Sequence, residues 1–425
     1  MDEKNIGRER QASIYVNGMS GKKPSIPIDM KALEARAKEM MTPEAFAYIA
    51  GGAGLESTIL ANREAFERRR IIPRMLRDVS ERDTSIELFS RKLPSPFLIS
   101  PIGVLEMAHE EADLAVARAA ASQSVPMIFS NQASVCMEDC AAVMGNSPRW
   151  FQLYWSVSDE LVESLVQRAE NCGCEAIVVT LDTTLLGWRV RDLDMAYLPF
   201  LRGKGIAQYV TDPVFKRFIE NPPSSDEISE KRTINFTAIR SLLELIDTYP
   251  ENFWKGLTSG EPLKAVRTFI RIYSRPSLTW DDLSFLRERT NLPILLKGIQ
   301  HVDDARKARE LGIDGLIVSN HGGRQVDGAV ASLDALENIV EAVGKDLRLI
   351  FDSGIRGGAD AFKALAIGAD AVCIGRPFVY ALAAGGQEGV EELLSNFKAD
   401  FDLTMGLAGC RSIAEITPDC LSSRL

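Results

Sequence analysis

The sequence predicts an α/β fold whose parallel strands close into a barrel, and three observations lead to this class. First, eight short apolar runs alternate with helical patterns along the 425 residues. Second, the runs are continuous rather than alternating, as in 177–179 (IVV), which is typical of strands buried on both faces. Third, no glycine-rich turn follows Ser100, where a doubly wound open sheet with fewer strands would place one. The expected architecture is therefore a (β/α)8, or TIM, barrel.

The strands are expected at 97–100, 126–129, 150–154, 176–181, 293–297, 315–319, 348–352 and 371–375. Their spacing is regular except between Asp182 and Pro293, where about a hundred residues replace the two dozen or so that one helix and its loops need. We assign 183–275 to a long insertion after strand 4. Because it leaves a strand at the end where barrel active sites form, it can act as a lid, and a partly disordered surface loop is the alternative.

Both ends of the chain carry signals outside the barrel. Residues 1–25 are polar, and we expect a flexible N-terminal arm there, followed by a single domain over 26–425. Asp29 can cap one short N-terminal helix, and Thr42 with Pro43 can begin a second. An apolar stripe with a period of four residues predicts a closing helix packed on the barrel. This stripe consists of Leu393, Phe397, Phe401 and Met405.

Composition and charge exclude several classes of protein. Apolar residues make up 46% of the chain and charged residues 25%, which excludes a disordered or fibrous class. Acidic residues exceed basic ones by 59 − 49 = 10, so we expect no nucleic-acid partner. No apolar run approaches the ~18 residues of a membrane span, and we expect none. Three scattered histidines (His109, His301 and His321) are too few for a histidine-rich metal site, so we expect no metal.

Polar side chains follow the predicted strands, and the carboxyl ends of barrel strands form one rim where active sites lie. His321 follows the sixth strand beside two glycines that remove bulk around it, and it can act as a general base. Arg324, three residues on, can bind a substrate carboxylate in bidentate fashion. Asp182, at the end of the fourth strand, can orient the imidazole and raise its basicity. This combination suits a 2-hydroxy or 2-oxo acid.

Glycines and arginines follow the seventh and eighth strands, where barrels bind phosphate through backbone N–H groups and a helix N-terminus. Gly354 and Arg356 come after the seventh strand, and Gly375 and Arg376 after the eighth. These two turns predict a phosphorylated ligand. Lys297, at the inward-facing end of the fifth strand, would place a cation beside a developing anion such as a reduced flavin.

These residues resemble the motifs of the FMN-dependent 2-hydroxy-acid oxidase and dehydrogenase family, the glycolate and lactate oxidase type. The resemblance extends from about Tyr48 to Ile416. Its most specific stretches are 319–325 (SNHGGRQ), 352–360 (DSGIRGGAD), 374–377 (IGRP) and 151–154 (FQLY). In detail the chain most resembles the lactate 2-monooxygenase subgroup, in 101–104 (PIGV), 187–192 (GWRVRD), 199–203 (PFLRG) and 297–301 (KGIQH).

The resemblance implies that the domain over 26–425 binds FMN and oxidises a small L-2-hydroxy acid to the 2-oxo acid with O2. The residues implied in catalysis are His321 as the base, Asp182 as its partner, Tyr154 and Lys297. The residues implied in substrate binding are Tyr48, Gln132, Tyr154, Arg189 and Arg324. The residues implied in FMN binding are Pro101, Ile102, Gly103, Ser130, Gln152, Thr180, Lys297, Ser319, Asp352, Gly354, Arg356, Gly375 and Arg376.

Two positions bear on the substrate and the product. Gln132 stands where glycolate oxidase has a tryptophan, so a more polar hydroxy or hydroxyamino metabolite is an alternative substrate. Gly103 matches the monooxygenase subgroup and favours oxidative decarboxylation of the product. Two other classes are alternatives: a non-catalytic flavin-binding barrel, and a barrel of the IMP dehydrogenase type. The second would carry a cysteine after the sixth strand, where this chain has His321.

Assembly and location are also expectations at this point. The resemblance implies a homo-oligomer, a homotetramer. The chain ends in Ser423-Arg424-Leu425, a conservative variant of the Ser-Lys-Leu peroxisomal address. We therefore expect a peroxisomal location if the source is eukaryotic and a cytoplasmic one otherwise.

Overall fold

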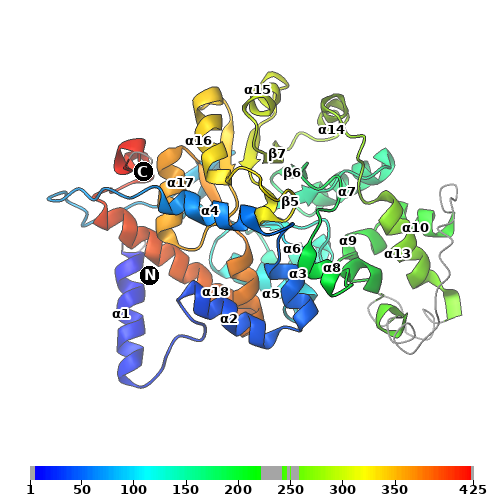
Figure 1. Cartoon of the computed structure of the whole chain (residues 1–425), viewed down its shortest axis with the longest axis horizontal. Coiled ribbons are helices and arrows are strands. Elements are labelled where there is room, and N and C mark those ends of the chain that lie inside the picture. Colours follow the sequence, from blue (N-terminus) through cyan, green and yellow to red (C-terminus); the bar gives the residue numbers. More distant parts are fainter. Residues whose placement is uncertain (1–4, 222–241, 247–248, 250–257, 423–425) are drawn as a thin grey trace.

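A computed structural model describes residues 5–221, 242–246, 249 and 258–422, which form a closed parallel barrel surrounded by helices (Figure 1). The strands of the barrel are β3 (Phe97–Ile99), β4 (Met127–Phe129), β5 (Arg149–Leu153), β6 (Ile177–Thr180), β7 (Ile294–Ile299), β8 (Gly315–Val318), β9 (Arg348–Phe351) and β10 (Ala371–Ile374). They follow one another in chain order, and β10 pairs with β3 to close the ring. The eight predicted strands and the (β/α)8 barrel are confirmed.

A helix lies between each pair of consecutive strands, as the alternating pattern predicts. These helices are α5 (Ala112–Ser122), α6 (Met137–Met144), α7 (Asp159–Asn171), α14 (Leu283–Arg287), α15 (Val302–Glu310), α16 (Ser332–Val343) and α17 (Gly358–Ile367), and α18 (Arg376–Leu407) follows the last strand. Two of them, α7 and α15, begin at a side-chain cap. Ser158 accepts a hydrogen bond from the backbone N–H of Leu161 at the start of α7, which satisfies a donor that the helix itself cannot.

The two faces of each barrel strand are buried in different places. In β6, Val178 belongs to the cluster inside the barrel, whereas Ile177 and Val179 belong to the cluster shared with the surrounding helices. A hairpin of β1 (Ile86–Leu88) and β2 (Arg91–Leu93), which the sequence analysis missed, adds its leucines Leu88 and Leu93 to the interior cluster. The hairpin precedes the first barrel strand and packs on the interior, so polar groups at the carboxyl ends of the strands remain available for a site.

Four helices precede the barrel, and the first of them corrects the sequence prediction. Residues 1–25 were expected to be a flexible arm, but α1 (Ile6–Met19) is a helix along most of this segment. The backbone N–H of Gly7 donates to the carboxylate of Asp402 at 2.9 Å, and Arg10 pairs with Glu392 at 2.7 Å, so α1 is held on α18. The prediction was wrong because the partners lie almost four hundred residues away in sequence, where local polarity gives no sign of them.

The other N-terminal helices are α2 (Met30–Met40), α3 (Pro43–Ala50) and α4 (Ser57–Glu67). The two predicted caps are confirmed, because Asp29 accepts from the backbone N–H of Ala32 and Thr42 from that of Ala45. The closing helix is confirmed as the second half of α18, beyond a kink at Gly385 and Gly386. Its predicted stripe is buried, with Phe397 and Phe401 packed edge-on against Phe97 of the first barrel strand.

The described helices of the predicted insertion lie on the side of the molecule away from α1 (Figure 1). Its described helices are α8 (Val190–Asp194), α9 (Ala207–Val210), α10 (Pro213–Glu220) and α13 (Glu261–Ile272). Residues 222–241, 247–248 and 250–257 of the predicted 183–275 lie outside the described residues, as does the terminal 423–425 on which the location rests. The lid and the location therefore stay predictions. Within the described part of the chain, each helix is too short or too polar to span a bilayer.

Candidate active site

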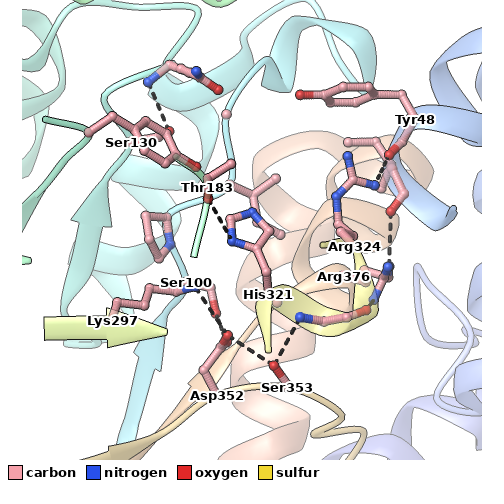
Figure 2. Close-up of a pocket in the computed structure, with 18 of the residues that line it drawn as sticks. Tyr48, Ser100, Ser130, Thr183, Lys297, His321, Arg324, Asp352, Ser353 and Arg376 are labelled. Atoms are coloured by element: carbon pink, nitrogen blue, oxygen red, sulfur yellow. Dashed lines mark hydrogen bonds and ion pairs between the residues drawn. The ribbon is translucent and has the colours of Figure 1, made fainter. Parts of the chain in front are cut away.

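One cavity opens at the carboxyl ends of the barrel strands, and most of the predicted site residues line it (Figure 2). Those residues are Tyr48, Pro101, Ile102, Gly103, Ser130, Gln132, Tyr154, Arg189, Lys297, His321, Arg324, Asp352, Gly354, Arg356, Gly375 and Arg376. His321 lies centrally in this view, with Lys297 and Asp352 to one side and Arg324 and Arg376 to the other. The structure thus gathers side chains that the sequence spreads over more than three hundred residues.

His321 is held by hydrogen bonds to its own turn. Its backbone N–H donates to Ser319 Oγ at 3.0 Å, and the N–H of Gly322 donates to Ser353 Oγ at 3.0 Å. Gly322 has φ +64°, a conformation that favours glycine, and a Cβ there would lie 2.8 Å from Nη1 of Arg376 and displace that guanidinium. The turn therefore fixes the imidazole of His321 at the cavity and allows the guanidinium of Arg376 to lie close to it.

The ring of His321 is oriented by Asp182, as predicted. Nδ1 lies 2.8 Å from Asp182 Oδ1, and Thr183 Oγ1 donates to the same carboxylate oxygen at 2.9 Å. A carboxylate accepts only, so Nδ1 carries the proton and Nε2 remains a free base. Burial raises the pKa of Asp182, but the charges of His321 and Lys297 outweigh it and hold that pKa well below its ordinary value. Burial lowers the pKa of His321 despite Asp182, so the imidazole is neutral at neutral pH.

Lys297 is a buried cation within a polar network. Its Nζ donates to Ser319 Oγ at 3.2 Å and lies 3.7 Å from an Asp352 oxygen and 3.9 Å from Asp182 Oδ2. Ser100 and Ser319 both donate to Asp352, at 2.9 and 2.6 Å. Burial lowers the pKa of Lys297, but the two carboxylates raise it above its ordinary value. The lysine therefore keeps its charge at the wall of the cavity.

Arg189 and Arg324 place two guanidinium groups at the cavity. Neither of them makes an ion pair with a described residue. Arg189 donates through Nη2 to Gln325 Oε1 at 2.9 Å. Arg324 donates to the carbonyls of Tyr48 and of Gly51, and its Cζ lies 4.9 Å from the centre of the Tyr48 ring. Burial, and then the charge of Arg189, lower the pKa of Arg324 to about 9. Asp192 is near enough for its charge to act on both arginines but forms no ion pair with either of them among the described residues. Two adjacent cations without a direct ion pair indicate a binding site for an anion such as a carboxylate.

Arg356 and Arg376 form a second cationic end of the cavity. Arg376 donates to the carbonyls of Gly322 at 2.8 Å and Gly51 at 2.9 Å, and within the described chain neither arginine pairs with a carboxylate. Burial, and then the charge of Arg376, lower the pKa of Arg356 to about 10. Helix α18 begins at Arg376 directly after Gly375, so its unpaired N–H groups start at the same place. This donor set fits the phosphate of FMN.

Three predicted FMN ligands do not line the cavity. Gln152 and Thr180 are buried in β5 and β6, and Nε2 of Gln152 and Oγ1 of Thr180 have no hydrogen-bond partner among the described residues. Buried polar atoms are nearly always paired, so these two orphans fit the polar edge of a flavin ring. Ser319 does not reach the cavity either, and it acts by linking Lys297 to Asp352.

The sequence analysis gave no role to several residues that complete the site. Thr183 and Ser353 hold Asp182 and the His321 turn, and Gln325 holds Arg189. The only sign of these residues in the sequence is that each stands next to a predicted site residue. Phe200 and Phe269 of the insertion also line the cavity, and their aromatic character was visible but not their position.

Comparisons with known proteins agree with this geometry. A family model described as FMN-dependent dehydrogenase matches residues 37–423. L-lactate oxidase of Lysinibacillus sphaericus is 42% identical over 387 residues, which cover 91% of this chain and 90% of that protein. An FMN-dependent alpha-hydroxy acid dehydrogenase of Penicillium citrinum is 40% identical over 412 residues, covering 97% of this chain and 94% of that protein.

Solved structures give the same result. The crystal structure of mandelate oxidase with benzoyl-formic acid is 36% identical with a TM-score of 0.75, and the match covers 94% of this chain and 99% of that chain. The similarity therefore extends over the barrel and its flanking helices rather than over one motif. This chain belongs to the FMN-dependent dehydrogenase family, and it is an FMN-dependent oxidoreductase of the 2-hydroxy-acid oxidase and dehydrogenase type.

Proposed function

We propose that this enzyme oxidises a small L-2-hydroxy acid to the 2-oxo acid and passes the electrons to O2. The observation that carries the proposal is one cavity lined by a neutral base, His321, and by Arg189 and Arg324, which form no ion pair among the described residues. Relatives named as oxidases support O2 as the acceptor: L-lactate oxidase of Lysinibacillus sphaericus and 2-hydroxyacid oxidase 1 of Homo sapiens.

The substrate carboxylate is bound by the two guanidinium groups. Arg189 and Arg324 are mutually repulsive when the site is empty, because the charge of Arg189 lowers the pKa of Arg324. A carboxylate between them removes that repulsion and adds charge-assisted hydrogen bonds. Because Tyr48 packs under Arg324 and Gln325 holds Arg189, the fork is oriented before substrate binds.

The substrate hydroxyl loses its proton to Nε2 of His321. Asp182, hydrogen-bonded to Nδ1, then stabilises the imidazolium that forms. FMN supplies the acceptor for the hydride that leaves the α-carbon. Lys297 contributes a buried positive charge, which would stabilise the negative charge of a reduced flavin. Its two carboxylate neighbours keep it protonated. Arg356, Arg376 and the N-terminus of α18 would hold the FMN phosphate, and Gln152 and Thr180 would bind its ring.

A second outcome is oxidative decarboxylation of the product, as in the lactate 2-monooxygenase subgroup. The observation that favours it is Gly103, which lines the cavity, and where a Cβ would lie 2.4 Å from the carbonyl oxygen of Gln132. Alanine at this position needs a shift of the Gln132 backbone, so the glycine sets the local shape of the cavity. Decarboxylation requires that this cavity retain the 2-oxo acid until the peroxide formed with O2 attacks it.

One experiment tests the proposal and separates the outcomes. The FMN-loaded enzyme is mixed anaerobically with L-2-hydroxy acids of increasing side-chain size, and the flavin absorbance is followed before air is admitted. We expect bleaching by at least one acid, then recovery in air with either a 2-oxo acid and peroxide or the acid shortened by one carbon and CO2. An enzyme that no 2-hydroxy acid bleaches would be a flavin-binding barrel without this activity.

We also propose a homotetramer, on the resemblance to the family. Light scattering coupled to size-exclusion chromatography tests it, because the chain of 425 residues would elute at four times its own mass. A monomer or dimer at micromolar concentration would contradict the proposal.

A further inference from the structure

The insertion builds an aromatic wall along one side of the cavity, and this wall consists of Phe200, Phe269 and Tyr273. The rings of Phe200 and Phe269 lie 5.3 Å apart and tilted, and those of Phe269 and Tyr273 are stacked at 5.0 Å. Phe269 is fully buried and Phe200 is 6% exposed, although both line the cavity. The wall is therefore fixed by its own packing and forms a rigid apolar boundary of the cavity.

The wall begins at the carboxylate-binding arginines. Arg324 lies over the face of the Tyr48 ring at 4.9 Å, and Tyr48 meets Phe200 edge to face with ring centres 6.5 Å apart. A substrate whose carboxylate is bound at Arg324 has its side chain directed by the rest of the cavity. Tyr48 and then Phe200 are the apolar surfaces that lead away from this point.

Gln132, which also lines the cavity, lies beside Phe200. The position of a Cβ at Gly205 would be 3.0 Å from the carbonyl oxygen of Gln132 and 3.2 Å from Cε1 of Phe200, so the two residues are neighbours. The backbone of Gln132 is engaged, because its N–H donates to Ser130 Oγ and its carbonyl accepts from Val104. Gln132 lines the cavity, and its side-chain amide makes no hydrogen bond with a described residue.

A methyl side chain, as in lactate, would leave both features unused. It would cover part of one ring, and the amide would face water rather than a ligand. A ring-sized apolar group would make more van der Waals and ring–ring contacts with the wall than a methyl group, and a hydrogen-bonding substituent on it would give the amide a partner. The combination of a rigid apolar wall and one neutral donor–acceptor group is typical of sites that fix the orientation of a ligand.

We infer that the preferred substrate is a 2-hydroxy acid whose side chain has a ring-sized apolar body and carries a hydroxyl or similar group at its far end, bound by Gln132. The inference rests on the proposed function and names the substrate class of the same site. It makes Gln132 a specificity-determining residue, and it makes the insertion the part of the chain that selects the substrate.

The test compares substrates that differ by one hydroxyl. Anaerobic flavin reduction by the FMN-loaded enzyme is measured for L-lactate, and for the pairs L-mandelate and L-4-hydroxymandelate, and L-3-phenyllactate and L-3-(4-hydroxyphenyl)lactate. We expect at least one ring-bearing acid to exceed lactate about tenfold or more in reduction rate over Kd. Within at least one pair, we expect the hydroxylated member to be favoured by about tenfold.

The variant Gln132→Met removes the hydrogen bond at nearly constant volume and should abolish the preference within the pair. The matched control is Gln167→Leu on the exposed face of α7, which should keep the native ratio. If lactate is reduced fastest, or if Gln132→Met keeps the native ratio, the inference is wrong and the proposed function stands. If Gln132→Met loses FMN, the ratios of the native enzyme alone decide. If no acid bleaches the flavin, the proposed function itself fails.

Discussion

The cavity has two halves that are built in different ways. The half formed by the barrel is charged and cross-linked, since Lys297, Ser319 and Asp352 share hydrogen bonds and His321 is fixed by Asp182. The insertion contributes Arg189 to the charged half, and the rest of its contribution is apolar, with the rings of Phe200 and Phe269 tilted against each other at 5.3 Å. Strand ends fix the groups that move protons and hold the cofactor, whereas the insertion supplies the surface that meets the substrate side chain. Substitutions in the two halves should therefore differ in kind as well as in size.

The largest of these effects is expected in the charged half, at Asp182→Asn. This change replaces the carboxylate at Nδ1 of His321 with a neutral amide, which cannot stabilise the imidazolium by charge, and it should lower flavin reduction by about 10²–10⁴-fold. In the native enzyme kcat/KM falls as the pH drops below the pKa of His321, which lies below its ordinary value because of burial. Asp182 raises that pKa, so the acid limb should move to lower pH in the variant. A pH profile with an unmoved limb would contradict the pairing.

Arg356→Gln should weaken FMN binding by about 10²-fold, because it removes charge-assisted hydrogen bonds of about 1.5–3 kcal/mol from the phosphate end. Fluorescence of released flavin after dilution measures the affinity, and excess FMN should restore turnover. The matched control is Arg348→Gln, an exposed arginine at the opposite end of the strand β9. Equal retention of FMN by both variants would place the phosphate elsewhere.

Arg189→Lys should raise KM by about 30-fold, equivalent to ~2 kcal/mol, because a lysine cannot offer the planar fork. Steady-state kinetics at saturating oxygen give the value. Arg191→Lys, two residues on and paired with Glu56 at the surface, is the control and should behave as the native enzyme. An unchanged KM in Arg189→Lys would exclude this residue from carboxylate binding.

The smallest effect is expected in the apolar half. Phe200→Leu should change the ratio of reduction rates for ring-bearing and methyl-bearing acids by about fivefold, or ~1 kcal/mol, because it removes one ring from the wall. Leu201→Ala, in the same segment but half exposed and away from the cavity, is the control. If Phe200→Leu instead lowered the rate for all acids equally, the apolar half would affect catalysis as well as the choice of substrate, and the division between the two halves would be wrong.

The barrel half could be predicted from the sequence because each of its groups follows an apolar strand, and strand ends of a closed barrel meet at one rim. His321, Asp182 and Lys297 were found in this way. The other features depend on contacts between distant segments. Helix α1 is fixed by Asp402 and Glu392, and Phe200 reaches the cavity through a fold of the insertion that no local pattern encodes. The spacing of the strands in the sequence predicts a side chain whose place is set by one strand end. It does not predict a side chain whose place depends on contact between two distant segments.

The role of His321 as the base is tested by the anaerobic rate of flavin reduction at saturating 2-hydroxy acid in His321→Gln, compared with the native enzyme at equal FMN content. We expect the variant to keep FMN and still bind the acid, because Arg189, Arg324 and the phosphate end are intact, but to be reduced about 10²–10⁴-fold more slowly. Reduction at the native rate would show that His321 does not take the proton.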